Sequence, residues 1–368
     1  MQTSSGLSSK GAVSPDAIFQ MAIGFWVSKT LMTAVELGVF TKLSDSEAVT
    51  IEQMRDDILQ MEQRPTEVFV TALISLGLLT VTTKSNAYGD GLNKKKLYSN
   101  SEIADLFLDK NKPSYIGDFI VMLDKHLYSR WDKLEQALKS NRPVRDTEDN
   151  ISGGKLYDQA KLNQALEQMQ MFTHSMYGIS VGPAMALAKV FDFSNHKKMM
   201  DIGGGSGIYS IEVIKAYPNM SAEILDLEPV SKISNEYIKK FNLQDKMYTR
   251  VLDFTKDELP TDCDVALLSH IIHFFTEEKI LSLLKKTYDS LSSENGVVII
   301  SEWLLNDDRT GPIPSALMSL TMVVDMPEGR NYSYEEVSKM LVDVGFKNIE
   351  RRPLAGPAEI VIGYKRNI

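Results

Sequence analysis

The stretch Asp201-Ile202-Gly203-Gly204-Gly205-Ser206-Gly207 decides how the C-terminal part of this chain folds. It follows a short apolar run with Met199 and Met200, and it leads into an amphipathic segment that begins near Ile208. An apolar strand, a glycine-rich turn and an amphipathic helix are the first parts of a βαβ unit. Glycines at this turn let the backbone approach a ligand closely and adopt conformations that a side chain would forbid. The stretch therefore predicts a ligand-binding turn.

An acidic residue follows at the distance that an adenosine site requires. The next apolar run ends in Asp226, about 20 residues after Gly203, where a carboxylate takes the ribose hydroxyls. The glycines run G-x-G-x-G, and Ile208 stands where a dinucleotide fingerprint has its last glycine. S-adenosylmethionine (SAM) has no phosphate to place there, and Asp201 suits its cationic amino group. A SAM site is the prediction, and a tight turn without a ligand is the alternative.

From residue 197 onward, short apolar strands alternate with helical segments. We expect strands and helices at 198–202, 209–216, 221–226, 230–241, 247–252, 265–269, 277–291, 296–303, 334–344, 348–353 and 358–365. Such alternation predicts an α/β fold, a Rossmann-like, mostly parallel sheet with helices on both faces. The last two strands have almost no residues between them and should form an antiparallel edge hairpin. Asp253 and Phe254 follow the third strand, where they would hydrogen-bond the adenine amine and pack against its ring.

The N-terminal part has a different texture. Residues 18–43 carry dense apolar positions at helical spacing, and residues 23–27 are apolar nearly all round, so another subunit is the expected cover. A helix ending at Gly77, a strand at 78–82 and a polar tip at 84–96 complete the pattern of an all-α, winged-helix domain. We expect a disordered tail (1–15), a winged-helix dimerisation domain (16–110), a helical linker and pocket cover (111–165, with a polar linker at 146–155), and a SAM-binding catalytic domain (166–368). One helix break is expected near Gly182-Pro183.

Composition limits the class of protein. The net charge of −9 argues against a nucleic-acid partner, which usually leaves a basic footprint. Cys263 is the single cysteine, so no internal disulfide forms and a reducing, cytoplasmic location is expected. No apolar run approaches the ~18 residues of a membrane helix, and the polar N-terminus has no signal core.

Taken together, these motifs resemble the small-molecule O-methyltransferases that carry an N-terminal dimerisation domain, such as the plant caffeate, hydroxyindole and bacterial polyketide enzymes. The likeness runs from about Phe25 to Lys365, and its marks lie at residues 34–40, 75–79, 191–194 and 296–302. The resemblance implies a homodimer that methylates a small molecule and binds neither nucleic acid nor membrane. It implies that SAM is held by a set of polar, glycine and apolar residues: Ser180, Asp201, Gly203, Gly205, Asp226, Leu227, Asp253, Phe254 and Ser269.

The same resemblance implies a general base. His273 takes the position of the family's catalytic histidine, and Glu302 that of the carboxylate which orients it. Phe274 and Phe275 replace the Asp and Trp of the family's His-Asp-Trp motif, and Asn331 replaces its second glutamate. These departures leave open an acceptor that needs less deprotonation, and therefore S- or C-methylation. A helix-cap or core role for His273 is the alternative.

The acceptor pocket is expected to be lined mainly by apolar side chains: Phe172, Met176, Trp303, Met318, Met322, Met326 and the polar Asn331. Methionines adapt to flat ligands, although Met and Phe at helical spacing are more often core residues. Two further functions stay open, a SAM-binding relative that does not methylate and a DNA-binding regulator. No metal site is expected, because His270 and His273 form the only close histidine pair, no third ligand is nearby and Cys263 is isolated.

Overall fold

The structure is a computed structural model that describes residues 13–85, 94–144 and 159–366. The chain divides into two compact units, Met1–Pro113 and Ser114–Ile368. The expected tail before residue 13 and the polar linker at 146–155 lie outside the described residues. So do residues 86–93 of the hairpin tip expected at 84–96, whereas residues 84–85 and 94–96 belong to strands. The finer division at residues 110 and 165 stays a prediction.

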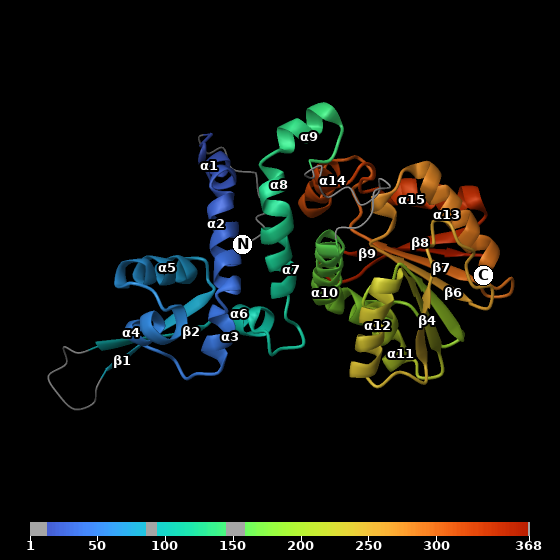
Figure 1. Cartoon of the computed structure of the whole chain (residues 1–368). Coiled ribbons are helices and arrows are strands. Elements are labelled where there is room, and N and C mark those ends of the chain that lie inside the picture. Colours follow the sequence, from blue (N-terminus) through green and yellow to red (C-terminus); the bar gives the residue numbers. More distant parts are fainter. Residues whose placement is uncertain (1–12, 86–93, 145–158, 367–368) are drawn as a thin grey trace. The chain divides into compact units, whose positions relative to one another are not determined.

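The first unit is mostly helical with one small sheet (Figure 1). Strands β1 and β2 pair antiparallel, with Leu79 opposite Asn100 and Ser85 opposite Lys94. The apolar segment expected at 18–43 forms three helices, because the chain turns at Ile23 and again at Gly38, whose φ is 68°. The elements are α1 (Asp16–Ala22), α2 (Gly24–Glu36), α3 (Val39–Ser44), α4 (Ile51–Gln53), η1 (Met54–Leu59), α5 (Gln63–Ser75), β1 (Leu79–Ser85), β2 (Lys94–Asn100) and α6 (Glu102–Leu108).

The second unit begins with helices. They are α7 (Gly117–Met122), η2 (Leu123–Tyr128), α8 (Ser129–Trp131), α9 (Leu134–Ser140) and the long α10 (Gln159–Val190). The break expected near Gly182-Pro183 is wrong, because α10 continues through Pro183. The turn that contains the proline is packed in the core, where Ala184 and Leu187 are fully buried, although Pro183 itself has no N–H to donate.

The rest of this unit is the expected doubly wound sheet. Its seven strands lie in the order β5-β4-β3-β6-β7-β9-β8. The first five are parallel, and β9 joins β7 and β8 antiparallel, so the edge hairpin is confirmed. The elements are β3 (Lys198–Ile202), α11 (Ile208–Ala216), β4 (Ser221–Asp226), α12 (Glu228–Lys240), β5 (Met247–Val251), β6 (Val265–Ser269), η4 (Ile272–Phe274), α13 (Glu277–Ser290), β7 (Val297–Glu302), α14 (Ile313–Asp325), α15 (Tyr334–Val344), β8 (Lys347–Pro353) and β9 (Glu359–Tyr364).

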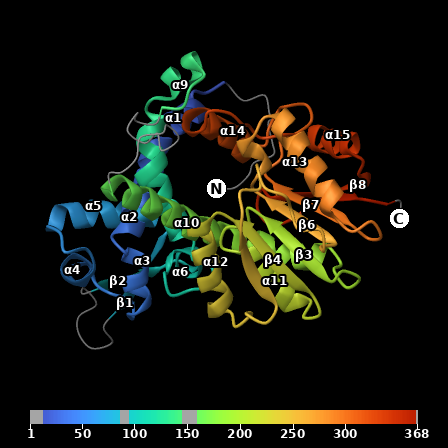
Figure 2. The same cartoon turned by 45° about the vertical axis from the view of Figure 1, so that its right-hand side comes forward.

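Helices cover both faces of this sheet (Figures 1 and 2). Helices α10, α11 and α12 pack on one face, and α13 and α15 pack on the other. Along β3, Met199 faces the core beneath α10, α11 and α12, and Met200 faces the core beneath α13 and α15. Neighbouring residues of the strand are therefore both buried. Strands covered on both sides need apolar residues at successive positions, which explains the unbroken apolar runs of the sequence. Because five strands run parallel, their carboxyl ends meet at one edge, where open α/β sheets bind ligands.

No single described helix is long and apolar enough to cross a membrane, although α1 and α2, which meet at a bend of 41°, reach that length and composition together.

Candidate active site

The glycine-rich turn between β3 and α11 adopts backbone conformations that glycine favours. Gly203, Gly205 and Gly207 have φ values of 66°, 56° and 75°. A Cβ on Gly203 would stand 2.4 Å from the Ile271 side chain, and one on Gly207 would stand 2.2 Å from that of Ile224. A Cβ on Gly205 would meet no atom within 4 Å. A side chain at Gly203 or Gly207 would therefore overlap a neighbouring residue, whereas Gly205 faces open space.

Asp226 is held by this turn. The Gly205 N–H donates to its Oδ2 at 3.0 Å and the Leu227 N–H donates to its Oδ1 at 2.8 Å. Burial raises the pKa of Asp226, and these two N–H groups oppose that rise. The carboxylate is thus fixed at the carboxyl end of β4, beside Gly205. Leu227, the next residue, leaves 44% of its surface exposed.

Asp201 lies beneath the same turn and lacks a full set of partners. Ser210 Oγ donates to its Oδ2 at 2.7 Å, whereas Oδ1 is buried with no hydrogen-bond partner. Burial, and to a smaller degree the neighbouring charge of Asp226, raise the pKa of Asp201 to about 7. A buried carboxylate oxygen without a donor is costly unless a ligand supplies one. The ammonium group of SAM is such a donor, so the residues present fit this cofactor.

The third strand brings two further predicted residues to the same edge. Phe254 lies against the turn, since a Cβ on Gly203 would be 3.1 Å from its ring, and it stands edge-on to Phe275. The Asp253 carboxylate accepts hydrogen bonds from the Thr255 N–H, the Thr255 hydroxyl and Lys256 Nζ. Lys256 and Thr255 together lower the pKa of Asp253 to about 2. Phe254 is therefore placed to pack against an adenine ring. The Asp253 carboxylate is ionised and already hydrogen-bonded.

His273 and Glu302 form a buried pair across the ends of β6 and β7. His273 Nδ1 lies 2.8 Å from Glu302 Oε2, and the Ile272 N–H donates to Oε1 at 3.1 Å. Both side chains are about 3% exposed. Burial alone would raise the pKa of Glu302, but the charge and hydrogen bond of His273 hold it below its ordinary value. A histidine that donates Nδ1–H to a carboxylate leaves its Nε2 free to accept a proton, as a general base requires.

His270 lies on the same carboxylate, which the sequence did not indicate. It adopts a left-handed backbone conformation (φ 55°), and its Nδ1 is 3.8 Å from Glu302 Oε2. Burial lowers the pKa of His270 to about 4, so its ring is neutral at neutral pH. The expectation that the His270–His273 pair has no third ligand nearby is wrong, because the end of β7 brings Glu302 to both rings. The spacing of the two histidines was the available signal.

Asn331, at the position of the family's second carboxylate, is buried and hydrogen-bonded within the protein. It is 2% exposed, its Nδ2 donates to the Trp303 carbonyl at 2.7 Å, and its N–H donates to Ser319 Oγ at 3.0 Å. Its hydrogen bonds thus join α14 to the end of β7. No sequence signal singled out Ser319 as the partner.

The remaining predicted residues lie on a few elements of this unit. Met318 and Met322 lie on α14, which contacts η4, the turn of His273, and Met326 follows at its end. The Trp303 ring stands edge-on to His270 at 6.0 Å. Ser269 ends β6 opposite Ser301. Phe172, Met176 and Ser180 lie on α10, where Phe172 is 44% exposed and Ser180 is buried.

The fold and the site define a SAM-dependent methyltransferase. A glycine-rich turn without the dinucleotide spacing, followed by Asp226, and the buried His273–Glu302 pair lie at the same edge of one doubly wound sheet. Comparison with known proteins identifies the family. A sequence model of the O-methyltransferase domain matches residues 131–347, and a model of the O-methyltransferase dimerisation domain matches residues 19–110. This chain belongs to the O-methyltransferase family. It is an enzyme of that class, with SAM as its cofactor.

Two relatives and one solved structure illustrate the likeness. The chain is 29% identical to a 3-hydroxy-5-methyl-1-naphthoate 3-O-methyltransferase of Streptomyces sahachiroi, over 95% of each protein. It is 29% identical to the acetylserotonin O-methyltransferase of Gallus gallus, over 95% of this chain and 97% of the relative. The human N-acetylserotonin methyltransferase structure in complex with SAM superposes with a TM-score of 0.83 at 22% identity, over 98% of this chain and 100% of that chain.

Proposed function

We propose that this enzyme methylates a hydroxyl group of a small aromatic acceptor, with His273 as the general base. The observation that carries the proposal is the 2.8 Å contact between His273 Nδ1 and Glu302 Oε2 at the ligand-binding edge of the sheet. It favours a base over a helix-cap or core role, because it orients the free Nε2. It also favours an acceptor with a proton to lose over a thioether, which has none.

SAM supplies a methyl carbon bonded to a cationic sulfur, which departs as a neutral thioether. Asp201 Oδ1, which has no partner in the protein, would accept a hydrogen bond from the ammonium group of SAM. Asp226, beside Gly205, would face the ribose. Asp253 and Phe254 would take the adenine, Asp253 only if its carboxylate exchanges one of its present donors. Gly203 and Leu227 would line the adenosine, and Ser180 and Ser269 would complete the set.

The residues of the acceptor side place and deprotonate the nucleophile. His273 Nε2 would take the proton of the acceptor hydroxyl, and Glu302 would neutralise the resulting imidazolium. General-base assistance of this kind contributes roughly 10²–10⁴-fold. Alignment of the reacting atoms supplies much of the remaining rate enhancement.

An aromatic acceptor is supported by the side chains around the base. The expected lining is apolar and adaptable, with Trp303 beside the histidines and methionines along α14. The two relatives described above are named for a hydroxynaphthoate and for acetylserotonin, both of which are aromatic. We therefore propose a flat, hydroxylated ring system as the acceptor class.

The proposal is tested with His273→Ala. We expect turnover of a hydroxyaromatic acceptor to fall by about 100-fold or more, with unchanged calorimetric affinity for S-adenosylhomocysteine. His174→Ala is the matched control, since His174 bonds to Tyr237 and does not contact Glu302. Turnover of the His273 variant equal to that of the wild type would remove this residue from the mechanism.

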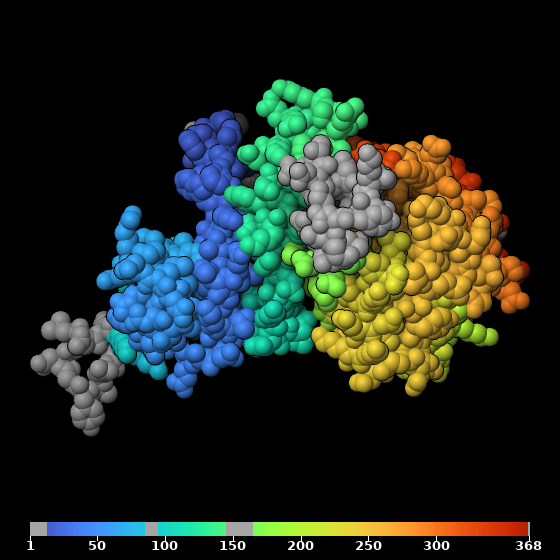
Figure 3. Space-filling view, in the orientation of Figure 1, coloured from blue at the N-terminus to red at the C-terminus, as the bar shows by residue number. Residues whose placement is uncertain are grey.

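We further propose a homodimer formed through the first unit. Helix α1 buries none of its residues, and its side chains stand at the surface in Figure 3. The exposed apolar side chains of α1 and α2 include Ile18, Phe19, Met21, Phe25 and Trp26. An apolar surface of this kind marks an interface.

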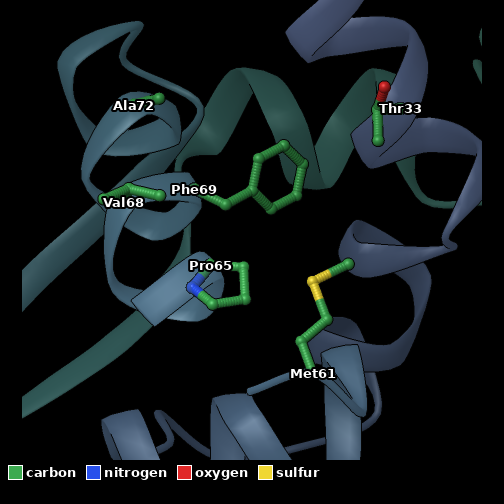
Figure 4. A pocket seen from close by; sticks show the side chains of 6 residues that line it. All are labelled: Thr33, Met61, Pro65, Val68, Phe69 and Ala72. Carbon is green, nitrogen blue, oxygen red and sulfur yellow. The ribbon is translucent and has the colours of Figure 1, made fainter. Parts of the chain in front are cut away.

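A nearby hollow extends this apolar surface. It has a volume of about 350 Å³, lies between α2 and α5, and is shown in Figure 4. Its lining is almost wholly apolar: Thr33, Met61, Pro65, Val68, Phe69 and Ala72. It lacks a titratable side chain, so we assign it to packing against a second copy and not to chemistry.

Light scattering on a sizing column tests the dimer. The double variant Phe19→Glu, Trp26→Glu should elute as a monomer, whereas Val342→Glu, an equally exposed apolar residue of α15, should remain a dimer. A wild-type monomer, or a dimer in the double variant, would overturn this assignment.

A further inference from the structure

Three potential metal ligands meet at the carboxyl ends of β6 and β7. His270, His273 and Glu302 each offer one ligand atom, and these atoms all lie within 4.8 Å of one another. Glu302 Oε2 is 2.8 Å from His273 Nδ1 and 3.8 Å from His270 Nδ1. The two rings stand 6.0 Å apart at an angle of 64°, so they converge on the carboxylate without stacking on each other.

The local backbone builds this arrangement. The left-handed conformation of His270 turns the chain back after β6, while the His270 N–H remains bonded to the Ser301 carbonyl at 2.9 Å. The short helix η4 then carries His273 to the same side. The Ile272 N–H fixes Glu302 through Oε1, and this leaves Oε2 directed at both histidines.

The donor set selects the kind of cation. Two imidazoles and one carboxylate form the protein ligands of many catalytic zinc sites, which keep a fourth position open. Zinc bonds of about 2.0–2.2 Å to nitrogen and oxygen put tetrahedral ligand atoms roughly 3.4 Å apart. The measured separations of 2.8 and 3.8 Å bracket that value. Ca²⁺ and Mg²⁺ prefer oxygen ligands and are disfavoured here.

We propose that His270, His273 and Glu302 form a binding site for a divalent transition-metal ion such as Zn²⁺, and that the bound ion switches off methyl transfer. The ion takes Nδ1 of His273 and Oε2 of Glu302, which now share a proton. A neutral imidazole bound through Nδ1 carries its proton on Nε2, where it donates to a neighbouring acceptor. The proton thus moves from Nδ1 to Nε2, none is released, and Nε2 no longer accepts the proton of the acceptor hydroxyl.

The binding of the ion does not depend on the proposed function, but its inhibitory effect does. The first experiment therefore needs neither SAM nor acceptor. Tag-free protein is titrated with Co²⁺, whose visible absorption reports coordination by nitrogen and oxygen. We expect saturable d–d bands at one Co²⁺ per chain, and their displacement by one equivalent of Zn²⁺. Wild-type protein without such bands would overturn the site.

His270→Asn is the sharpest variant. Asn tolerates the left-handed conformation of residue 270 better than most side chains, so the turn is retained while the imidazole ligand is lost. We expect at least tenfold weaker Co²⁺ binding in this variant and wild-type binding in the control His174→Asn. Equal binding by His270→Asn and wild type would show that the ion sits elsewhere and would overturn the proposal. A thermal melt of each variant confirms that it is folded.

Inhibition is measured separately, with a hydroxyaromatic acceptor under saturating SAM. Zn²⁺ should reduce wild-type turnover at the concentration that displaces Co²⁺, a chelator should restore it, and His270→Asn should need about tenfold more Zn²⁺ for the same fractional loss. Co²⁺ bands together with full turnover in Zn²⁺ would overturn the inhibitory half of the proposal. That outcome would also count against His273 as the base, whereas missing bands would leave the base untouched.

Discussion

The two halves of the sheet's carboxyl edge satisfy their polar groups in different ways. On the β3–β4 half, both oxygens of Asp226 are bonded, but Asp201 buries an oxygen without a partner and Gly205 faces open space. On the β6–β7 half, both oxygens of Glu302 are bonded, one to Ile272 and one to His273. We propose that the cofactor supplies the donor which Asp201 lacks, whereas the Glu302 carboxylate already has its partners within the protein. If the proposed roles hold, the difference teaches that a cofactor site can leave an acceptor for its ligand, while a general base is oriented by the protein beforehand.

The strongest way to break this comparison is Glu302→Gln. The amide accepts from Ile272 through its oxygen and donates its NH₂ to His273 Nδ1, which moves the histidine proton to Nε2 and disables the base. We expect kcat to fall by roughly 10²–10⁴-fold with unchanged S-adenosylhomocysteine affinity, by analogy with an Asp-to-Asn change in a catalytic triad. Glu359→Gln, which alters the residue paired with Glu302 in the sheet but bonded to Arg351, should leave kcat unchanged. A Glu302 variant with wild-type kcat would contradict the proposal that Glu302 orients His273 for catalysis.

A pair of glycine variants separates ligand space from packing on the cofactor half. Both Gly205→Ala and Gly207→Ala place a side chain at positive φ, at a cost of roughly 1–2 kcal/mol in unfolding free energy. Only Gly207→Ala also overlaps Ile224, which adds about 1–3 kcal/mol. We therefore expect a larger drop in Tm for Gly207→Ala, and at least tenfold weaker S-adenosylhomocysteine binding for Gly205→Ala. Unchanged affinity in Gly205→Ala would show that the open space is not cofactor space.

Cofactor affinity should depend on pH through Asp201. The pKa of its carboxyl is raised to about 7, so the free protein holds a proton there at pH 6. A bound ammonium favours the ionised form, binding therefore releases that proton, and affinity rises with pH. Calorimetry with S-adenosylhomocysteine should show roughly fivefold tighter binding at pH 7 than at pH 6. In Asp201→Asn, where Ser210 and Asp226 remain, the pH dependence should vanish, and its persistence would assign the proton to another group.

The smallest effect is expected for Asn331→Asp. Its hydrogen bonds run to Trp303 and Ser319, so a carboxylate here faces the Trp303 carbonyl and leaves it without a donor. We expect a loss of about 1–3 kcal/mol in unfolding free energy and a change in kcat below about threefold. Denaturant melts and steady-state kinetics check the two quantities. A tenfold rise in kcat would instead show that a second carboxylate assists His273.

Much of this edge was predictable from the sequence, for a local reason. The glycine turn, Asp226 and the alternation of strands and helices along the chain follow from spacing and periodicity, both of which are set within a few residues. Even the position of His273 follows from the resemblance. Cofactor class, fold and enzyme class were therefore accessible before the structure.

What was missed depends on contacts between distant segments. The left-handed backbone conformation of His270 depends on tertiary contacts, because no local sequence pattern forces a histidine to positive φ. Asp253 is hydrogen-bonded to Thr255 and Lys256, and Asn331 to Ser319. No pattern in the sequence predicts these partners. Pro183 suggests a helix break, yet α10 continues through it, with Ala184 and Leu187 buried in the core. The sequence thus predicted which residues carry the chemistry, but not which residues they would contact.

The antiparallel strand β9 has a consequence for how the protein is made in the cell. Among the seven strands it is the last to be synthesised, yet it lies inside the sheet, directly beside the strand that ends in Glu302. Until residues 359–364 emerge, β7 presents an unpaired edge of the kind that recruits other chains. A message truncated shortly before this segment would therefore yield an aggregation-prone and inactive product, even though every residue proposed for binding and catalysis had already been translated.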